Sequence, residues 1–331
     1  MVGQRRTTAR FPALSAKAGH YESFYIKACH PSEPRGVWIR HTVHKRPGEP
    51  PTGSVWFVLF DAASEGPRAS KVTLPDPRTG SGELIGVGES SLRPGEATGA
   101  ARSEECDASW ELRFSGEEPI FHLPRDWMYH APIPRTKSLS PHPAARYEGR
   151  VRVDGREIEL DGWPGMLGHN WGAEHAERWI WLHGLGFRGA SEDTWLDATI
   201  GRVKVGPLTT PWIANGVLSL DGERHRLGGP EKARATEVSE TPDRCEFALP
   251  GKGLSVQGTV QADRKDLVGW VYADPDGGEH NTANCSISDM RLQVTREDAS
   301  PLVLELSGGA AYELGMRERD HGVAIQPFPD G

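Results

Sequence analysis

Glycine and proline interrupt this chain so often that long helices are excluded. There are 39 glycines and 26 prolines among 331 residues, about one residue in five, and these two residue types are the least favourable in a helix interior. Short runs rich in valine, isoleucine, tryptophan, phenylalanine and threonine lie between them, as in SVWFVLFD at 54–61. Such runs between turn residues are typical of strands. The sequence therefore predicts an all-β protein with two packed antiparallel β-barrels.

Two Asp-Gly pairs predict tight β-hairpins. Asp154-Gly155 lies between GRVRV and REIEL, and Asp221-Gly222 lies between VLSL and ERHRL. Both central residues of a type I′ turn need a positive φ, which Asp and Gly tolerate. We therefore expect each pair to close a two-stranded hairpin.

A proline-rich stretch at 131–146 predicts the domain boundary. It reads APIPRTKSLSPHPAAR and shows no strand or helix periodicity, which is typical of an extended connector. We therefore divide the chain into an N-terminal tail at 1–18, a first β-barrel domain at 19–140 and a second β-barrel domain at 141–331. At this length two domains are expected rather than one.

Charge and composition exclude several classes of protein. The formal net charge is −8 and both signs are dispersed, without a basic run, so nucleic acid is not an expected partner. No stretch approaches the roughly 20 apolar residues that span a bilayer, so we predict no integral membrane segment and expect a cytoplasmic location. The sequence has no Walker loop, no G-x-G-x-x-G after a strand and no G-x-S-x-G, so no cofactor is predicted. A homodimer is compatible with these features.

The stretch 165–187, GMLGHNWGAEHAERWIWLHGLGF, is the densest in aromatic and histidine side chains. Successive side chains of a strand point to opposite faces, so Trp179, Trp181 and His183 share one face. The glycine-flanked segment 168–172 before them suits a bulge or a turn. If the opposite face packs on a core, the two indoles and the imidazole face a cavity. We therefore interpret this stretch as a strand that contacts an apolar small-molecule ligand.

Eight residues form the predicted ligand-binding set: Trp38, Asn170, Trp171, His175, Trp179, Trp181, His183 and Trp212. The alternative for most of the tryptophans is ordinary core packing, because aromatic side chains supply large contact areas in cores and pockets alike. His169, His175 and His183 also suggest a zinc triad. Their spacings of six and eight residues lack the helical i, i+4 pattern of many zinc sites. Strand spacing does not exclude ligation, but scattered histidines are common, and no metal is predicted.

Several short segments carry a family resemblance. They are HYESFY at 20–25, WIR at 38–40, PRTK at 134–137, VDGREIELDGW at 153–163, GHNWG at 168–172 and WIW at 179–181. Together they resemble the two-domain lipocalin-like (calycin) superfamily of carotenoid 1,2-hydratase (hydroxyneurosporene synthase), AttH-like proteins, tocopherol cyclase and lipocalin-like Diels-Alderases. The resemblance implies two packed β-barrels around an apolar cavity, and members that act on prenyl chains, quinol heads or polyenes without a metal or a nucleotide. The histidine-rich central stretch departs from the carotenoid and tocopherol enzymes.

Three residues are the candidates for catalysis: Glu22, Asp197 and His169. Hydration or cyclisation of an isoprenoid needs a proton donor and aromatic faces that tolerate positive charge. Asp197 alternates with Trp195 and Thr199, and an apolar cavity on that face would raise its pKa. The alternative for Asp197 is a rim position or an arginine partner. Glu22 and His169 have structural alternatives too, as acceptors or anchors for neighbouring polar groups.

Three functions are compatible with these residues. The first is a cofactor-independent hydratase, cyclase or isomerase that acts on an apolar isoprenoid, polyene or related substrate. The alternative is a non-catalytic lipid or pigment binding protein, whose pocket contains only polar groups that satisfy one another. The third is a carbohydrate-active β-sandwich, which requires an open groove with two facing carboxylates. An acid–base group that faces an enclosed apolar cavity would favour the first.

Overall fold

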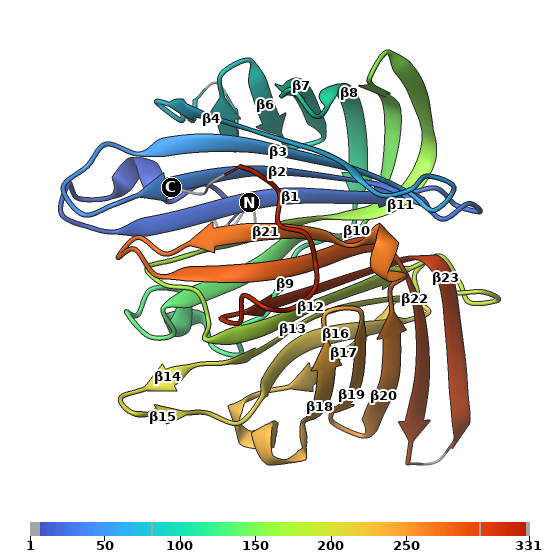
Figure 1. The fold of residues 1–331 in the computed structure, drawn as a ribbon. Helices are drawn as coiled ribbons and strands as arrows, with labels where there is room; N and C mark the ends of the chain where they lie inside the picture. Colours follow the sequence, from blue (N-terminus) through green and yellow to red (C-terminus); the bar gives the residue numbers. More distant parts are fainter. Residues whose placement is uncertain (1–6, 81, 298, 329–331) are drawn as a thin grey trace.

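Two large antiparallel sheets, stacked on each other, form the fold (Figure 1). The structure, a computed structural model, describes residues 7–80, 82–297 and 299–328. Its described helices are short 3-10 turns at Phe11–Ala13, Asp126–Tyr129, Pro230–Ala235 and Arg264–Asp266. The predicted all-β class is therefore confirmed, and the frequent glycines and prolines explain why no longer helix forms in these ranges.

The first sheet is built from the N-terminal half of the chain. Its strands are β1 (His20–Cys29), β2 (Arg35–Lys45), β3 (Thr52–Asp61), β4 (Arg68–Pro75), β5 (Ile85–Val87), β6 (Ser90–Arg93), β7 (Glu96–Arg102), β8 (Asp107–Gly116), β9 (Ile120–Phe121), β10 (Thr136–Val153) and β11 (Arg156–Gly172). They pair in the order β4-β3-β2-β1-β11-β10-β8-β7-β6-β5, and β9 also pairs with β10.

The second sheet is built from the C-terminal half. Its strands are β12 (Arg178–Leu185), β13 (Trp195–Arg202), β16 (Ile213–Leu220), β17 (Glu223–Gly228), β18 (Glu237–Thr241), β19 (Arg244–Pro250), β20 (Leu254–Gln261), β21 (Val268–Ala273), β22 (Glu279–Arg296) and β23 (Ala299–Met316). They pair in the order β17-β16-β13-β12-β23-β22-β20-β19-β18, and β21 also pairs with β22. A small separate hairpin consists of β14 (Lys204–Val205) and β15 (Leu208–Thr209).

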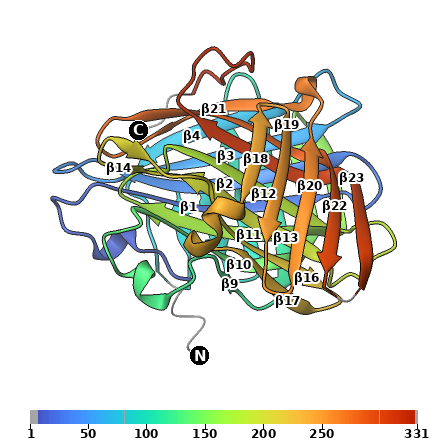
Figure 2. The ribbon, with the colours of Figure 1, turned by 90° about the horizontal axis from the view of Figure 1, so that it is seen from below.

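The two sheets repeat one topology. In each sheet the first strand pairs with the last, β1 with β11 and β12 with β23, and three sequential strands extend from the first strand to one edge. A short strand off the main path, β9 or β21, pairs with the long penultimate strand in both sheets. Figure 2 shows the second sheet from below, with β18, β19 and β20 beside β22 and β23. The fold is thus a tandem pair of similar units.

Both Asp-Gly hairpins are present. Asp154 and Gly155 connect β10 to β11 with φ values of 50° and 81°, and Asp221 and Gly222 connect β16 to β17 with 50° and 85°. Positive φ at both central positions is what the type I′ turn requires. The hairpin prediction is confirmed.

The boundary between the sheets lies later in the chain than the prolines suggested. Residues 136–172 form β10 and β11, which belong to the first sheet, and the second sheet begins at Arg178. The predicted division at 140/141 therefore falls inside β10, which is a single strand of the first sheet. The prolines did not end the strand because they lie where the pairing of β10 with β11 shifts register, between Leu139 and Ala145. Proline is tolerated at such irregular positions of a strand.

The segment before β1 packs against the first sheet. Of the predicted tail at 1–18, residues 1–6 lie outside the described residues, while Phe11 is buried at the start of a 3-10 turn. The backbone N–H groups of Arg10 and Phe11 donate to the carboxylate of Glu22. A buried carboxylate on β1 therefore holds this segment in place.

One hydrophobic core joins the two sheets. It contains Trp38 and Trp56 from β2 and β3 together with Trp270 from β21. The rings of Trp56 and Trp270 meet edge to face, with centroids 4.9 Å apart. A second core lies within the first unit alone. All four cysteines are buried and free. No helix in the described ranges is both long and apolar enough to cross a membrane.

Candidate functional site

A cavity of about 210 Å³ lies between the two sheets. Its wall is formed mainly by aromatic and aliphatic side chains from β1, β2, β12, β13, β21 and β23, and by the segment that precedes β10. Its lining includes Tyr21, Tyr25, Trp38, Arg40, Asn170, His175, Trp179, Trp181, Gly201, Tyr272 and Glu313. Ligand sites are typically concave and apolar with a few convergent polar groups, and this cavity has that character.

Strand alternation explains why the aromatic side chains meet here. Trp179 and Trp181 are two residues apart on β12 and both line the cavity. Tyr21 and Tyr25 share the corresponding face of β1, and the ring of Tyr25 meets that of Trp181 edge to face at 5.0 Å. Residues two or four positions apart on a strand point to the same side. The cavity is thus walled by aromatic rings from both units.

His175 and Asp274 form a hydrogen-bonded dyad at the cavity wall. The ring Nδ1 of His175 lies 2.7 Å from Asp274 Oδ1, and the His175 backbone N–H donates to the same oxygen at 2.7 Å. An ionised carboxylate only accepts, so Nδ1 carries the proton and Nε2 is the free nitrogen. Nε2 is buried and has no hydrogen-bond partner. The ring is held against Tyr21, with centroids 3.8 Å apart.

Burial and hydrogen bonding act in opposite directions on Asp274. Burial alone would raise the pKa of Asp274, but the hydrogen bonds from the ring and backbone of His175 lower it below its ordinary value. The carboxylate therefore stays ionised at neutral pH and fixes the tautomer of His175. Such an imidazole, oriented by a carboxylate and free at Nε2, is the usual form of a general acid or base.

Glu313 is a carboxylate on the cavity wall, and three neighbouring side chains donate hydrogen bonds to it. Trp179 Nε1 donates to Oε1 at 2.9 Å, while Tyr272 Oη and Asn284 Nδ2 donate to Oε2, each at 3.0 Å. The side chain is buried. Glu313 therefore places negative charge beside the aromatic rings without an ion-pair partner among these three donors.

Arg40 brings positive charge to the same cavity. Its Nε donates to Ser23 Oγ at 2.7 Å, and its guanidinium carbon lies 4.0 Å from the centroid of the Tyr272 ring. The residue is 5% exposed, and Nη1 has no hydrogen-bond partner. The site thus combines a free imidazole nitrogen, a carboxylate and a guanidinium in an aromatic enclosure.

One cluster at this wall has the residue types of a cation site. The ligand atoms of His175, Asp274 and His280 lie within 4.8 Å of one another. His280 Nδ1 is 3.6 Å from Asp274 Oδ2, and burial lowers the pKa of His280 to about 4. Two imidazoles and a carboxylate are ligands that zinc and iron accept. In the structure, however, the His175 nitrogen nearest Asp274 serves the hydrogen bond between them.

The structure brings five of the eight predicted ligand residues to the cavity. They are Trp38, Asn170, His175, Trp179 and Trp181. His183 shares the predicted face of β12 but lies deeper, where its Nε2 donates to the Pro143 carbonyl at 2.8 Å. Trp171 is covered by the Arg10 guanidinium, and Trp212 by that of Arg202. These last three do not line the cavity.

Glu22 and His169 lie together, away from the cavity. Glu22 is on the face of β1 opposite to Tyr21, and His169 Nε2 lies 2.8 Å from its Oε1. Burial alone would raise the pKa of Glu22, but hydrogen bonds from His169 and His20 lower it to about 2. Their positions match the structural alternative, in which a buried acid accepts hydrogen bonds from backbone and imidazole groups. The catalytic role predicted for these two residues gains no support from this geometry.

Asp197 is also buried but not at the cavity. Ser140 Oγ donates to its Oδ2 at 2.5 Å, and His122 Nε2 lies 3.4 Å from the same oxygen. Burial alone would raise the pKa of Asp197, but His122 and Ser140 lower it below its ordinary value. The expectation of a raised pKa is therefore corrected, because polar partners surround this acid instead of apolar ligand.

Sequence reasoning missed the polar residues that face the cavity. Arg40 alternates with Trp38 on β2, so a strand pattern does place it on the same face. Asp274 follows β21 and Glu313 lies on β23, far along the chain from the aromatic stretch. Glu313 approaches that stretch through the pairing of β23 with β12, and Asp274 through the pairing of β21 with β22 and of β22 with β23. The local sequence contains no signal for these pairings.

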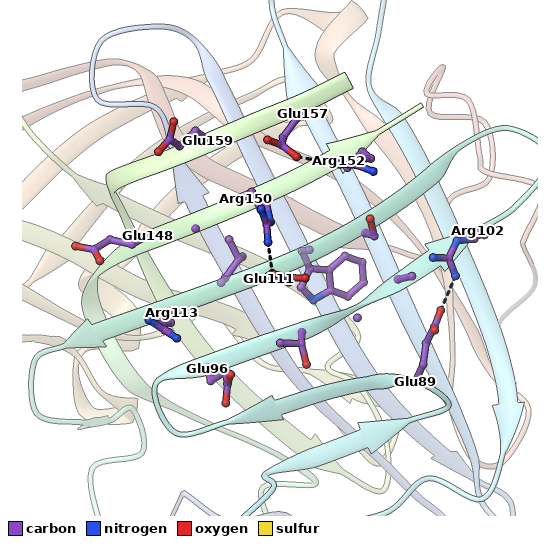
Figure 3. Close-up of a pocket in the computed structure, with 17 residues that line it drawn as sticks. Glu89, Glu96, Arg102, Glu111, Arg113, Glu148, Arg150, Arg152, Glu157 and Glu159 are labelled. Atoms are coloured by element: carbon purple, nitrogen blue, oxygen red, sulfur yellow. Dashed lines mark hydrogen bonds and ion pairs between the residues drawn. The ribbon is translucent and has the colours of Figure 1, made fainter. Parts of the chain in front are cut away.

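A larger hollow, about 1050 Å³, lies on the outer face of β7, β8, β10 and β11. Figure 3 shows that it is lined by alternating acidic and basic side chains. Arg150 pairs with Glu111 at 2.8 Å and Arg152 with Glu157 at 3.0 Å, and all four are exposed. Its carboxylates are interleaved with arginines rather than facing one another across a groove. This surface therefore lacks the arrangement that a glycoside-cleaving site needs.

The fold and the site define an all-β protein of two similar sheets that enclose an aromatic cavity. No family model matches the chain. Two uncharacterized proteins of Mycobacterium tuberculosis, from strains CDC 1551 / Oshkosh and ATCC 25618 / H37Rv, are each 24% identical over 356 residues. Each comparison covers 100% of this chain and 95% of the relative.

Solved structures with the same fold cover nearly the whole chain. A protein described as AttH from Nitrosomonas europaea has a TM-score of 0.56 at 14% identity, covering 94% of this chain and 97% of that one. Kievitone hydratase from Nectria haematococca has 0.55 at 10%, covering 92% and 90%. CghA has 0.57 at 11%, covering 92% and 89%. The chain therefore has the lipocalin-like β-barrel fold of these proteins, which confirms the resemblance at the level of the fold.

Proposed function

We propose that the protein is a cofactor-independent enzyme of the hydratase, cyclase or isomerase type, acting on an apolar isoprenoid, polyene or related substrate. The observation that carries the proposal is the His175–Asp274 dyad, whose free Nε2 belongs to a residue that lines an aromatic cavity. The fold shared with kievitone hydratase, an enzyme by its name, is consistent with this proposal.

Hydration illustrates what the dyad would do. In its protonated form, His175 transfers the Nε2 proton to one carbon of a carbon–carbon double bond, and the other carbon becomes cationic. Water adds to that carbon, and its surplus proton returns to Nε2, so the imidazole is regenerated. Trp179 and Tyr272 present ring faces that stabilise the cation, and the Glu313 carboxylate adds negative charge beside them.

A non-catalytic binding protein is the alternative, and the unpaired polar atoms of the cavity bear on the choice between the two. In that case the polar groups of the cavity would satisfy one another, as the three donors of Glu313 do. His175 Nε2 and Arg40 Nη1 instead have no partner. Unpaired buried polar atoms cost about 1–3 kcal/mol each. Their retention in a cavity is expected where a substrate supplies the missing partners.

The test combines ligand identification with isotope incorporation. Native mass spectrometry identifies any compound that copurifies, and that compound, together with a panel of prenyl alcohols and prenylated phenols, is incubated in H₂¹⁸O and analysed for hydrated or rearranged products. We expect His175→Asn to lower turnover about 100-fold or more, with ligand affinity nearly unchanged. His225→Asn, on β17 and outside the cavity, is the matched control.

Two results would count against the proposal. Full turnover by His175→Asn would remove the dyad from the mechanism. Tight binding of the compounds without any product would favour the lipid or pigment binding protein instead.

A further inference from the structure

Arg40 is a buried cation that has no carboxylate of a described residue within direct ion-pair distance. It forms no ion pair with a described residue, although it is only 5% exposed. Ser23 accepts the hydrogen bond from Nε, and Nη1 is left without a partner. A buried charge without a counter-charge is costly, by several kcal/mol for an isolated ion. The fold must therefore offset this cost by other means, or a ligand must supply the anion.

Aromatic rings around Arg40 supply part of the compensation. Its guanidinium carbon lies 4.0 Å from the ring centroid of Tyr272, 5.1 Å from that of Trp56 and 5.9 Å from that of Trp38. Such cation–π contacts are worth about 0.5–2 kcal/mol. A ring face attracts the flat side of the guanidinium, but it does not replace the in-plane acceptor that an N–H group needs. The hydrogen-bonding edge at Nη1 therefore remains unsatisfied.

The charges of the cavity are separated by a tyrosine. The ring of Tyr272 lies under Arg40, while its hydroxyl donates to Glu313 Oε2 at 3.0 Å. Glu313 is thus occupied by its own donors, and its charge repels any other anion from that end. An acidic ligand would therefore place its headgroup at Arg40 and its apolar body along the remaining aromatic wall.

We propose that Arg40 is the headgroup site of the cavity and that the substrate is an apolar carboxylic acid, whose carboxylate accepts hydrogen bonds from the guanidinium. Arginine suits this role because its planar N–H groups match the geometry of a carboxylate. The proposal rests on the apolar substrate proposed above and narrows it to acids. Arg40 then determines which molecules bind and in which orientation they reach His175.

The experiment compares two probes that differ only in the headgroup. Geranic acid and geraniol have the same branched ten-carbon chain, and their binding to the full chain is measured at pH 8 by quenching of tryptophan fluorescence and by calorimetry. We expect the acid to bind about tenfold or more tightly than the alcohol, since a tenfold ratio corresponds to one favourable charged hydrogen bond. This comparison needs only the wild-type protein.

Variants assign the preference to Arg40. Arg40→Met should lower the affinity for geranic acid about tenfold and leave that for geraniol within about twofold, while Arg40→Lys keeps part of the preference. Arg202→Met is the matched control, because Arg202 also covers a tryptophan, Trp212, but does not line the cavity.

Each outcome distinguishes the two proposals. Equal binding of acid and alcohol by the wild-type protein, or an acid preference that survives in Arg40→Met, would overturn the headgroup site and leave the apolar substrate standing. Absence of binding by both probes would overturn the headgroup site together with the isoprenoid substrate class.

Discussion

At the scale of single residues, the hydrogen-bond donors around a buried acid decide whether it stays ionised. Glu22, Asp197 and Asp274 are all buried carboxylates with lowered pKa values, but of these three only Asp274 has a histidine partner that lines the cavity. The hydrogen-bond partners of each acid therefore distinguish Asp274, which is connected to the cavity through a histidine, from Glu22 and Asp197. Burial by itself does not make a catalytic acid when hydrogen-bond donors hold the carboxylate ionised.

Glu22 gives a prediction about pH. Its pKa is about 2 in the folded protein and 4.5 ordinarily, so the unfolded chain binds the proton more readily. The stability that Glu22 contributes, about 3 kcal/mol from this difference, is complete above pH 4.5 and is lost as the pH falls toward 2. We expect Glu22→Gln to lower the free energy of unfolding by about this amount at pH 7 and by much less near pH 2.

Urea titrations at several pH values measure this effect. Glu49→Gln, an exposed acid outside the network, is the control. An equal loss at both ends of the pH range would contradict the linkage. Because Glu22 does not line the cavity, the affinity of Glu22→Gln for geraniol should stay unchanged.

The cluster of His175, Asp274 and His280 gives a prediction about metals. The His175 nitrogen that faces Asp274 is engaged in the hydrogen bond between them, so a cation would have to displace that proton. We expect elemental analysis of the purified protein to find far less than one zinc or iron per chain, and EDTA to leave turnover unchanged. Zinc at one equivalent that is lost in His280→Ala would instead assign these residues to a metal centre.

At the scale of strands, glycines hold the aromatic rings in place. Trp179 on β12 pairs with Gly315 of β23 on one side and with Gly201 of β13 on the other. A methyl group on Gly315 would overlap the indole of Trp179, whereas one on Gly201 would meet the nearest atom at an ordinary 3.6 Å. The cavity wall therefore requires a glycine at one neighbour of Trp179 and only tolerates it at the other.

Alanine at these two glycines is a matched pair of tests. Gly315→Ala should displace the indole, break its hydrogen bond to Glu313 and weaken geraniol binding about tenfold, since overpacking typically costs 1–3 kcal/mol. Gly201→Ala should bind nearly as the wild type does. Tryptophan fluorescence titrations report both. Equal affinities for the two variants would show that the Trp179 position does not control the cavity.

At the scale of the whole molecule, the shared core makes two similar sheets one folding unit. Trp56 of the first sheet and Trp270 of the second are fully buried against each other. Separate domains with a small interface would unfold independently, whereas a continuous apolar core couples them. The cavity lies within this junction, so its shape depends on both sheets.

Calorimetry tests the coupling. We expect one cooperative transition for the full chain, and Trp270→Ala to lower the free energy of unfolding by about 3–5 kcal/mol while the transition stays single. Trp127→Ala, at a position 62% exposed, is the control and should change little. Two resolved transitions in the wild-type protein would contradict a joint core.

The sequence by itself determined the parts of this protein that depend on near neighbours. Glycine and proline exclude long helices, Asp-Gly pairs close the hairpins, and alternation places Trp179 and Trp181 on one face, because each effect acts over a few residues of chain. The position of the boundary between the sheets could not be predicted from near neighbours, because β10 keeps its pairing with β11 despite its prolines.

Only the tertiary structure decided which polar groups meet in the cavity. Arg40 and Glu313 line it from β2 and β23, and Asp274, at the end of β21, holds the lining residue His175. Their approach follows from long-range pairing that local residues do not encode. The position of Glu22 also depended on the tertiary structure. The packing of the second sheet determines which face of β1 becomes the cavity wall, and Glu22 lies on the opposite face. Chemistry at a junction between sheets is decided by the packing of the sheets.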